Sequence, residues 1–232
     1  MRETLLKGLP ALGLDTSLVP VLEQFAGILL ERNRVMNLTA ITGPRDVAAL
    51  HLLDSLALAQ LAGLRDENVV DVGTGAGFPG LPLAAALGNA RFTLLDSLGK
   101  RVDFLRDACE ALGLENAVCV QARAEEFAGD QRESFDCAAS RAVADLPVLC
   151  ELCLPLVRVG GRFLAMKSSH CDEEVQRAGA AIRALGGQLG WVRDYTVPTT
   201  DVVHRVVCVE KVSPTPRRFP RRFAQIKKQP LG

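Results

Sequence analysis

The hydrophobic pattern changes its period near residue 63. Before that point apolar residues recur at the spacing of an amphipathic helix, after a capping group at Asp15-Thr16-Ser17, and they include Leu18, Val21, Leu22, Phe25, Ile28 and Leu29. A second helix is expected from about Arg45 to Leu61. Residues 1–63 are therefore predicted to form an N-terminal helical extension.

Beyond Gly63, short apolar runs alternate with longer amphipathic segments. The runs predict strands at Asn68–Val72, Arg91–Asp96, Ala117–Gln121, Phe135–Ser140, Arg162–Lys167, Gln188–Tyr195 and Val202–Glu210. The segments between them predict helices at Gly80–Leu87, Leu98–Leu112, Ala144–Leu156 and Glu173–Leu185. This alternation predicts an α/β fold at 64–210, with a mostly parallel, doubly wound sheet of seven strands. Only VPTTD separates the last two strands, which is too short for a helical crossover, so we expect a C-terminal antiparallel hairpin.

Composition agrees with an ordinary globular chain that folds as one structural domain overall. Of the 232 residues, 48% are apolar and 23% are charged, which excludes disordered and collagen-like classes. No apolar run approaches the roughly 18 residues of a membrane span, and the N-terminus lacks the pattern of a signal peptide. We expect a cytoplasmic monomer without a membrane partner.

Cysteine usage bears on redox state and metal binding. The seven cysteines lie mostly in apolar runs, where a thiol behaves as a small hydrophobe, so we expect them to be reduced. Cys150 and Cys153 form one C-x-x-C, which fits a redox pair, half of a zinc site or the core of a helix. Zinc needs further ligands at matching spacing, whereas His51, His170 and His204 are scattered. We expect core positions and no metal.

The net charge of the chain is zero, but its charged residues are unevenly distributed along the sequence. Of the 27 basic residues, seven lie at or beyond Lys211, where there is no acid, so the preceding part has a net charge of −7. In this tail, residues 211–232, cations are interleaved with Phe219 and Phe223, which suits phosphate contact and base stacking. A solvated terminus is the alternative. The predicted RNA-binding residues are Arg217, Arg218, Arg221, Arg222, Lys227 and Lys228.

The strand NVVDV runs into the glycine-rich turn GTGAGFPG and then a helix. Glycine allows the backbone to approach a ligand closely, and a helix N-terminus presents free N–H groups, so the turn predicts a nucleotide or nucleoside site. Gly75, Gly77 and Gly80 also satisfy the dinucleotide pattern G-x-G-x-x-G. The turn alone therefore leaves NAD and a methyl donor as candidate ligands.

Three features favour S-adenosylmethionine. Asp71 stands where a carboxylate would repel a pyrophosphate but suits a cationic sulfonium compound. Pro79 removes an N–H donor where a pyrophosphate needs one. The hairpin is not expected of the standard six-stranded dinucleotide fold. The sequence thus predicts a class I methyltransferase, with a Rossmann-like sheet.

Two acidic positions follow the next strands. Asp96 ends the second strand, where its acceptor oxygens suit both ribose hydroxyls, although it could equally cap the following helix. Ala124 and Glu125 follow the third strand at the ligand-binding edge of such sheets, where they could border the adenine. A solvated first helical turn is the alternative for Glu125.

These motifs resemble one known family, the RsmG (GidB) guanine-N7 methyltransferases of 16S rRNA. The matching segments are RNRVMNLTAI (32–41), HLLDSL (51–56), DVGTGAGFPGLPLA (71–84), LLDSLGKRVDFL (94–105), ARAEE (122–126), FDCAASRAVADL (135–146) and FPRRFAQIKKQPL (219–231). The resemblance implies methyl transfer from S-adenosylmethionine to N7 of a guanine in 16S rRNA, either free or in a small ribosomal subunit particle. The cofactor residues that it and the glycine turn imply are Gly73, Gly75, Phe78, Asp96, Ala124, Glu125 and Arg141.

Guanine N7 carries a lone pair and no proton, so this reaction needs no general base. Alignment of N7 with the methyl group can itself contribute roughly 7–11 kcal/mol. The candidates for positioning the guanine are Asn37, Lys167 and Arg141, with His51 and Asp54 shaping the same opening. Structural alternatives are a turn cap for Asn37, a pair for His51 and Asp54, a solvated strand end for Lys167, and a surface ion pair for Arg141.

Two other functions fit parts of the sequence. The first is an NAD-dependent oxidoreductase, which binding of NADH rather than S-adenosylhomocysteine would identify. The second is an RNA-binding assembly factor that keeps the fold without the chemistry, which activity on small-subunit RNA would exclude.

Overall fold

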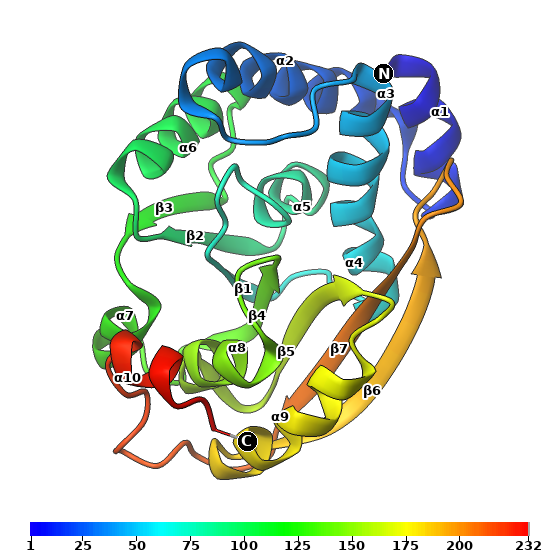
Figure 1. Cartoon of the computed structure of the whole chain (residues 1–232). Helices are drawn as coiled ribbons and strands as arrows, with labels where there is room; N and C mark the ends of the chain where they lie inside the picture. The colour runs from blue at the N-terminus through cyan, green and yellow to red at the C-terminus, as the bar shows by residue number, and fades with distance from the viewer. Residues whose placement is uncertain (232) are drawn as a thin grey trace.

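A seven-stranded sheet forms the centre of the protein. The computed structural model describes residues 1–231 (Figure 1). The strands are β1 (Asn68–Val72), β2 (Arg91–Asp96), β3 (Ala117–Gln121), β4 (Phe135–Arg141), β5 (Val157–Ser168), β6 (Gly187–Thr196) and β7 (Val203–Lys211). Their order is β3-β2-β1-β4-β5-β7-β6, and β7 runs antiparallel to both of its neighbours. The predicted strands and the C-terminal hairpin are confirmed.

Helices cover both faces of this sheet. The longer ones are α1 (Arg2–Ala11), α2 (Val19–Met36), α4 (Asp54–Ala62), α6 (Gly99–Leu112), α8 (Leu146–Cys153) and α9 (Asp172–Ala184). The shorter ones are α3 (Pro44–Asp46), α5 (Gly80–Ala86), α7 (Ala124–Asp130) and α10 (Phe223–Lys228), and a π-helical segment, Val47–Leu53, continues directly into α4. None of the helices within residues 1–231 is long and apolar enough to cross a bilayer.

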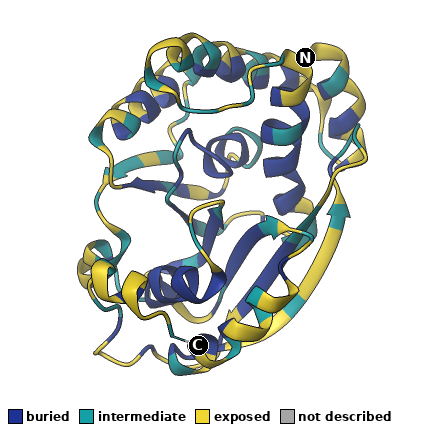
Figure 2. Cartoon of the chain, viewed as in Figure 1, coloured by how far each residue is buried: buried dark blue, intermediate teal, exposed yellow. Residues whose placement is uncertain are grey.

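Side-chain alternation explains the two layers. Val69 and Val70 are neighbours in β1 but belong to different cores, because successive residues of a strand point to opposite faces. The first core joins one face to α1, α2, α4, α5 and α6, and the second joins the other face to α7, α8, α9 and α10. Figure 2 shows the buried residues on the sheet and on the inner sides of these helices.

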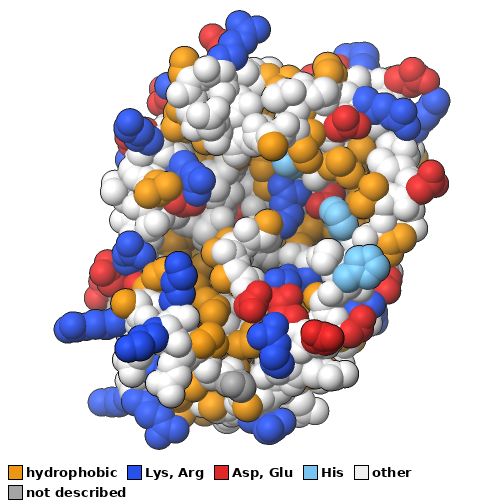
Figure 3. Space-filling model, in the orientation of Figure 1, with side chains coloured by type: hydrophobic (Ala, Val, Ile, Leu, Met, Phe, Trp, Pro, Cys, Tyr) orange, Lys and Arg blue, Asp and Glu red, His pale blue; other side chains and the backbone are white. Residues whose placement is uncertain are grey.

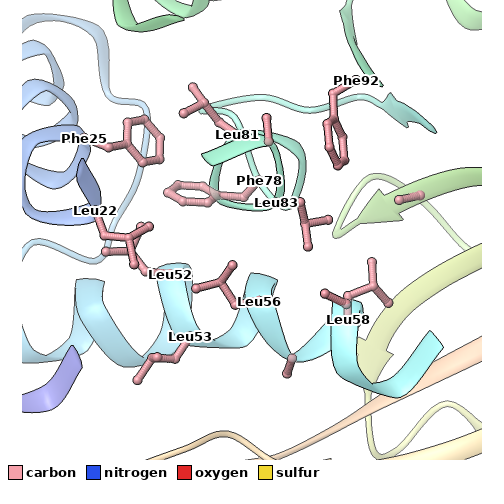
Figure 4. Close-up of a cluster of buried hydrophobic side chains, with 14 of the residues drawn as sticks. Leu22, Phe25, Leu52, Leu53, Leu56, Leu58, Phe78, Leu81, Leu83 and Phe92 are labelled. Carbon is pink, nitrogen blue, oxygen red and sulfur yellow. The ribbon is translucent and has the colours of Figure 1, made fainter. Parts of the chain in front are cut away.

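The N-terminal helices share the first core with the glycine-rich turn. Leu22 and Phe25 of α2 and Leu56 of α4 converge with Phe78 and Leu81, which follow β1 (Figure 4). The ring centroids of Phe25 and Phe78 are 5.4 Å apart. The helices of residues 1–63 therefore support the turn from one side.

The tail also packs on the fold. Phe219 and Ile226 are buried in the second core, and the Arg132 guanidinium donates to the carbonyl oxygens of Thr215 and Phe219. Lys211 is fully buried, and its Nζ donates to Leu154 O at 2.6 Å. Two elements on this face, α7 and α10, were not predicted from the sequence.

Candidate functional site

The glycine-rich turn begins where β1 ends. Gly73 and Thr74 donate their backbone N–H groups to Leu95 O of β2, at 2.8 and 3.1 Å, which fixes the turn against the neighbouring strand. Gly75 has φ +60°, a conformation that costs a residue with a Cβ about 1–2 kcal/mol. A Cβ built at Gly75 would meet only Gly73 O, at 3.9 Å. The space above Gly75 is therefore open to a ligand.

Asp71 supports the turn from below and does not face a ligand. Its Oδ2 accepts hydrogen bonds from Thr74 Oγ1 at 2.6 Å and from Gly80 N at 2.7 Å, so it joins the turn to the start of α5. Complete burial raises its pKa to about 6. The expectation that Asp71 meets a cationic ligand directly is wrong, because the carboxylate is turned into the protein.

A first pocket of about 480 Å³ opens above the turn. Asp96 lies in its wall, where Oδ2 accepts from Gly75 N at 3.0 Å and Oδ1 accepts from Leu98 N at 2.9 Å. The side chain thus orders the turn and the start of α6. Arg101 Nη1 also lies 3.5 Å from Oδ2, and Oδ1 keeps a second lone pair for a ligand hydroxyl. The pocket also includes Gly73, Phe78 and Arg141.

His51, Phe78 and Arg141 form a stack beside the first pocket. The rings of His51 and Phe78 are stacked with centroids 4.5 Å apart, and the Arg141 guanidinium carbon lies 4.9 Å from the Phe78 centroid. Arg141 Nη2 donates to His51 Nδ1 at 3.2 Å, so the imidazole carries its proton on Nε2, toward Thr39 Oγ1 at 2.7 Å. Burial and the charge of Arg141 lower the pKa of His51 to about 4. His51 is therefore neutral at pH 7.

Asp54 is a buried acceptor that joins four elements. It is 1% exposed, and its Oδ2 accepts from Arg141 Nη1 at 3.0 Å. Its Oδ1 accepts from Tyr195 Oη of β6 at 2.7 Å and pairs with His204 Nδ1 of β7 at 2.8 Å. Burial alone would raise the pKa of Asp54, but the bond from His204 and the charge of Arg141 hold it below 3.8. The structural alternative, a simple pair of Asp54 with His51, is not observed, because Asp54 bonds Arg141, Tyr195 and His204 instead.

A second pocket of about 470 Å³ adjoins the first. The two share His51, Arg141 and Ala142 in their walls. Ala142 has φ +55°, which is strained for a residue with a Cβ, so the chain after β4 is held in an uncommon conformation between the pockets. Lys167 and Glu174 line the second pocket. Figure 3 shows this face hollowed at its centre, with Lys or Arg and His side chains on the wall.

The structure brings together most of the predicted site residues. Gly73, Gly75, Phe78, Asp96 and Arg141 line the first pocket, and Lys167, His51 and Asp54 line the second, together with Arg141. The site also contains Thr74, Arg101, Tyr195, His204 and Glu174, which were not predicted. Thr74 and Arg101 lie inside the segments 71–84 and 94–105, whereas the other three lie in no motif.

Three predicted residues lie elsewhere. Asn37 ends α2 in the left-handed conformation, with φ +50°, and lines neither pocket, which agrees with its structural alternative. Ala124 and Glu125 begin α7, and neither lines the first pocket. Glu125 instead borders a third pocket, between α7 and the tail, that also includes Arg222 and Lys227.

The tail divides into exposed cations and an anchor. Arg217, Arg218, Arg222, Lys227 and Lys228 are exposed. Contrary to the prediction, Arg221 holds the tail on α8, because its Nη2 and Nε lie 2.6 and 2.8 Å from the buried carboxylate of Glu151. Figure 3 shows blue side chains gathered at the lower left, where Figure 1 places α7 and α10.

Cys150 and Cys153 lie inside α8, where both thiols are fully buried in the second core. Burial raises the pKa of Cys153, which disfavours the thiolate that metal binding or redox exchange needs. Within residues 1–231 no group of three His, Cys, Asp or Glu side chains is arranged to hold a metal ion.

Known proteins similar to this chain include methyltransferases of ribosomal RNA. The family described as GidB, rRNA small subunit methyltransferase G, matches residues 19–198. The ribosomal RNA small subunit methyltransferase G of Alkaliphilus metalliredigens is 44% identical over 221 residues, which cover 94% of this chain and 92% of that protein. The protein of the same name from Pelotomaculum thermopropionicum is 42% identical and covers 100% of this chain and 99% of its own length.

Solved structures support the fold. An O-methyltransferase from Bacillus cereus in complex with S-adenosylhomocysteine has a TM-score of 0.55 at 20% identity, over 81% of this chain and 90% of that chain. TrmN from Thermus thermophilus has a TM-score of 0.54 at 26% identity, over 68% of this chain and 48% of that chain. The class I methyltransferase fold predicted from the sequence is confirmed, and the match along nearly the whole chain shows that this protein belongs to the rRNA small subunit methyltransferase G family.

Proposed function

We propose that the protein transfers the methyl group of S-adenosylmethionine to N7 of one guanine in 16S rRNA of the small ribosomal subunit. The observation that carries this proposal is a pair of adjoining pockets that share Arg141, His51 and Ala142. The first pocket is formed by the glycine-rich turn and by Asp96 at the end of β2, a combination that suits a nucleoside. The second pocket can accept a base. Family membership supports rRNA as the substrate.

The residues of the first pocket fit S-adenosylmethionine. The open space above Gly75 admits a ligand against the backbone, and Asp96 keeps acceptor capacity for ribose hydroxyls. The bound donor supplies an electrophilic methyl group on a cationic sulfur. A lone guanidinium beside it would oppose that charge, but Asp54 neutralises Arg141 and His51 is uncharged at pH 7. The shared wall therefore suits a cation.

The protein then has mainly to position the base. Guanine N7 attacks the methyl group with its own lone pair and releases no proton, so no side chain has to act as a base. Arg141 is held by Asp54 and by Leu50 O, at 3.0 and 3.1 Å, which makes the wall between the two pockets rigid. Such fixed orientation is worth several kcal/mol in reactions of this kind.

The exposed cations of the tail, Arg217, Arg218, Arg222, Lys227 and Lys228, are proposed to contact rRNA phosphates. Their exposure and the absence of acids between Lys211 and Leu231 support this role.

The test is methyl transfer from labelled S-adenosylmethionine to 16S rRNA, offered free and as a small-subunit particle, with nucleoside mass spectrometry of the product. We expect 7-methylguanosine at one position with the wild type and none with Gly75→Val as the matched control. Methylation of another atom would refute the assignment to N7. Binding of NADH without binding of S-adenosylhomocysteine would refute the methyltransferase itself.

A further inference from the structure

The second pocket contains an ion pair that the reaction does not require. Lys167, near the end of β5, and Glu174, in the first turn of α9, lie with Nζ and Oε1 2.5 Å apart. Their side chains are only 12% and 14% exposed, and both line the pocket. Other contacts hold them in place, since Lys167 Nζ donates to Ala144 O at 2.9 Å and Glu174 Oε1 accepts from Leu146 N.

One oxygen of this pair remains available to a ligand. Both protein partners of Glu174 use Oε1, and within residues 1–231 no group donates to Oε2. This Oε2 is not among the buried side-chain atoms that lack a partner, so solvent reaches it, and Glu174 lines the pocket. The pocket therefore offers an ammonium donor beside a carboxylate acceptor that is partly unused.

An ammonium donor beside a carboxylate acceptor matches the Watson–Crick edge of guanine. On its Watson–Crick edge, guanine has the acceptor O6 next to the donors N1–H and N2–H₂, so a lysine can donate to O6 while the unused Oε2, with its two lone pairs, accepts from N1–H and N2–H₂. Adenine has an amino donor in place of O6 and a bare nitrogen at N1, so it would oppose both side chains. Apolar side chains of Ile41, Met166 and Val202 line the same pocket and can cover the faces of a base.

We infer that Lys167 and Glu174 read the Watson–Crick edge of the target guanine, with Lys167 at O6 and Glu174 at N1–H and the N2 amino group. Recognition of this edge leaves N7, on the other side of the base, free to face the first pocket. The inference rests on the proposed function and names Glu174 as a residue that determines specificity.

The experiment compares guanine with inosine at the target position of the rRNA. Inosine keeps O6, N1–H and N7 but lacks the N2 amino group, so it loses one hydrogen bond to Glu174. We expect the wild type to prefer guanine by about 10-fold or more in kcat/KM, the range for one hydrogen bond to a charged group. Glu174→Gln should reduce this preference to about 1, because the amide can keep an acceptor for Leu146 N while the carboxylate is lost.

A matched control separates recognition from stability. Glu173→Gln removes the same charge from the same helical turn, but Glu173 is exposed and does not line the pocket, so its guanine-to-inosine ratio should equal that of the wild type. A purely structural role of Glu174 would lower both rates together and leave their ratio unchanged.

The outcomes are distinguishable. An unchanged ratio in Glu174→Gln, with normal methylation by the wild type, would overturn the inference and leave the proposed function intact. Equal rates of the wild type on guanine and on inosine would also overturn the inference. This comparison does not depend on whether the Glu174→Gln variant is stable. Absence of any methylation by the wild type would refute the proposed function and the inference with it.

Discussion

Replacing Asp54 with asparagine should destabilise the protein strongly while preserving the shape of the side chain. Asp54 is almost completely buried. It accepts hydrogen bonds from Arg141 and Tyr195, and it also pairs with His204. An amide carries no charge and has only one acceptor oxygen, so either Arg141 or the Tyr195 and His204 pair would face an N–H donor.

The size of the effect follows from the ion pair. Removing one partner of a buried pair costs about 3–5 kcal/mol, and we take about 3 because the Arg141 side chain is 15% exposed. For a chain of this length, about 3 kcal/mol lowers Tm by about 6–12 °C. The control is Tyr195→Phe, which removes one donor and leaves the Arg141 and His204 contacts, so we expect about 1.5 kcal/mol.

The stability lost in Asp54→Asn should depend on pH, because the contribution of His204 to this network depends on pH. The hydrogen bond to Asp54 raises the pKa of His204 above 6.5, so this contact adds stability that is fully present below pH 6.5 and is lost as pH rises through the raised pKa. Asp54, with its pKa below 3.8, remains ionised throughout this range. The difference in Tm between wild type and Asp54→Asn should therefore be larger at pH 6 than at pH 9, whereas that of Tyr195→Phe should not change.

Thermal melting followed by circular dichroism at both pH values measures these differences. A Tm for Asp54→Asn within about 2 °C of the wild type would show that the ion pair contributes little. An equal difference at pH 6 and pH 9 would show that His204 gains nothing from Asp54.

Three further predictions concern ligand binding. Gly75→Val should abolish binding of S-adenosylhomocysteine in a folded protein, because the added atoms enter the first pocket; near-normal affinity in calorimetry would separate this turn from the cofactor site. Asp96→Ala should weaken S-adenosylhomocysteine by about 1.5–3 kcal/mol, and a change of less than about twofold in Kd would leave Asp96 with its structural bonds alone. Replacing Arg217, Arg218 and Arg222 with glutamine should leave cofactor affinity unchanged but flatten the dependence of log RNA affinity on log salt, by up to about 0.7–0.9 per lost phosphate contact. Parallel lines for this variant and the wild type would mean that these arginines touch no phosphate.

The sequence by itself determined the sheet, its connections and the glycine turn. Strand and helix periods are local properties, and the short VPTTD loop leaves the last two strands no arrangement but a hairpin. The two short helices α7 and α10, of 7 and 6 residues, were not predicted, because a helical period needs a window of about 11 or more residues to stand out. The helix α5 is as short, but it follows the glycine-rich turn, which predicts the start of a helix.

Only the tertiary structure decided which side chains form the site. The partners of Asp54 are 87, 141 and 150 residues away in the chain, so no local sequence pattern predicts this network. Arg221 and Arg222 are adjacent and chemically identical, yet one is bound to Glu151 and the other is exposed. Asp71 turned out to face the protein interior, where Thr74 and Gly80 donate to its Oδ2 and no described group donates to its Oδ1. A sequence specifies which groups are available, but their direction and partners depend on how distant elements pack, because that packing decides which polar groups lose contact with water and must find a partner in the protein.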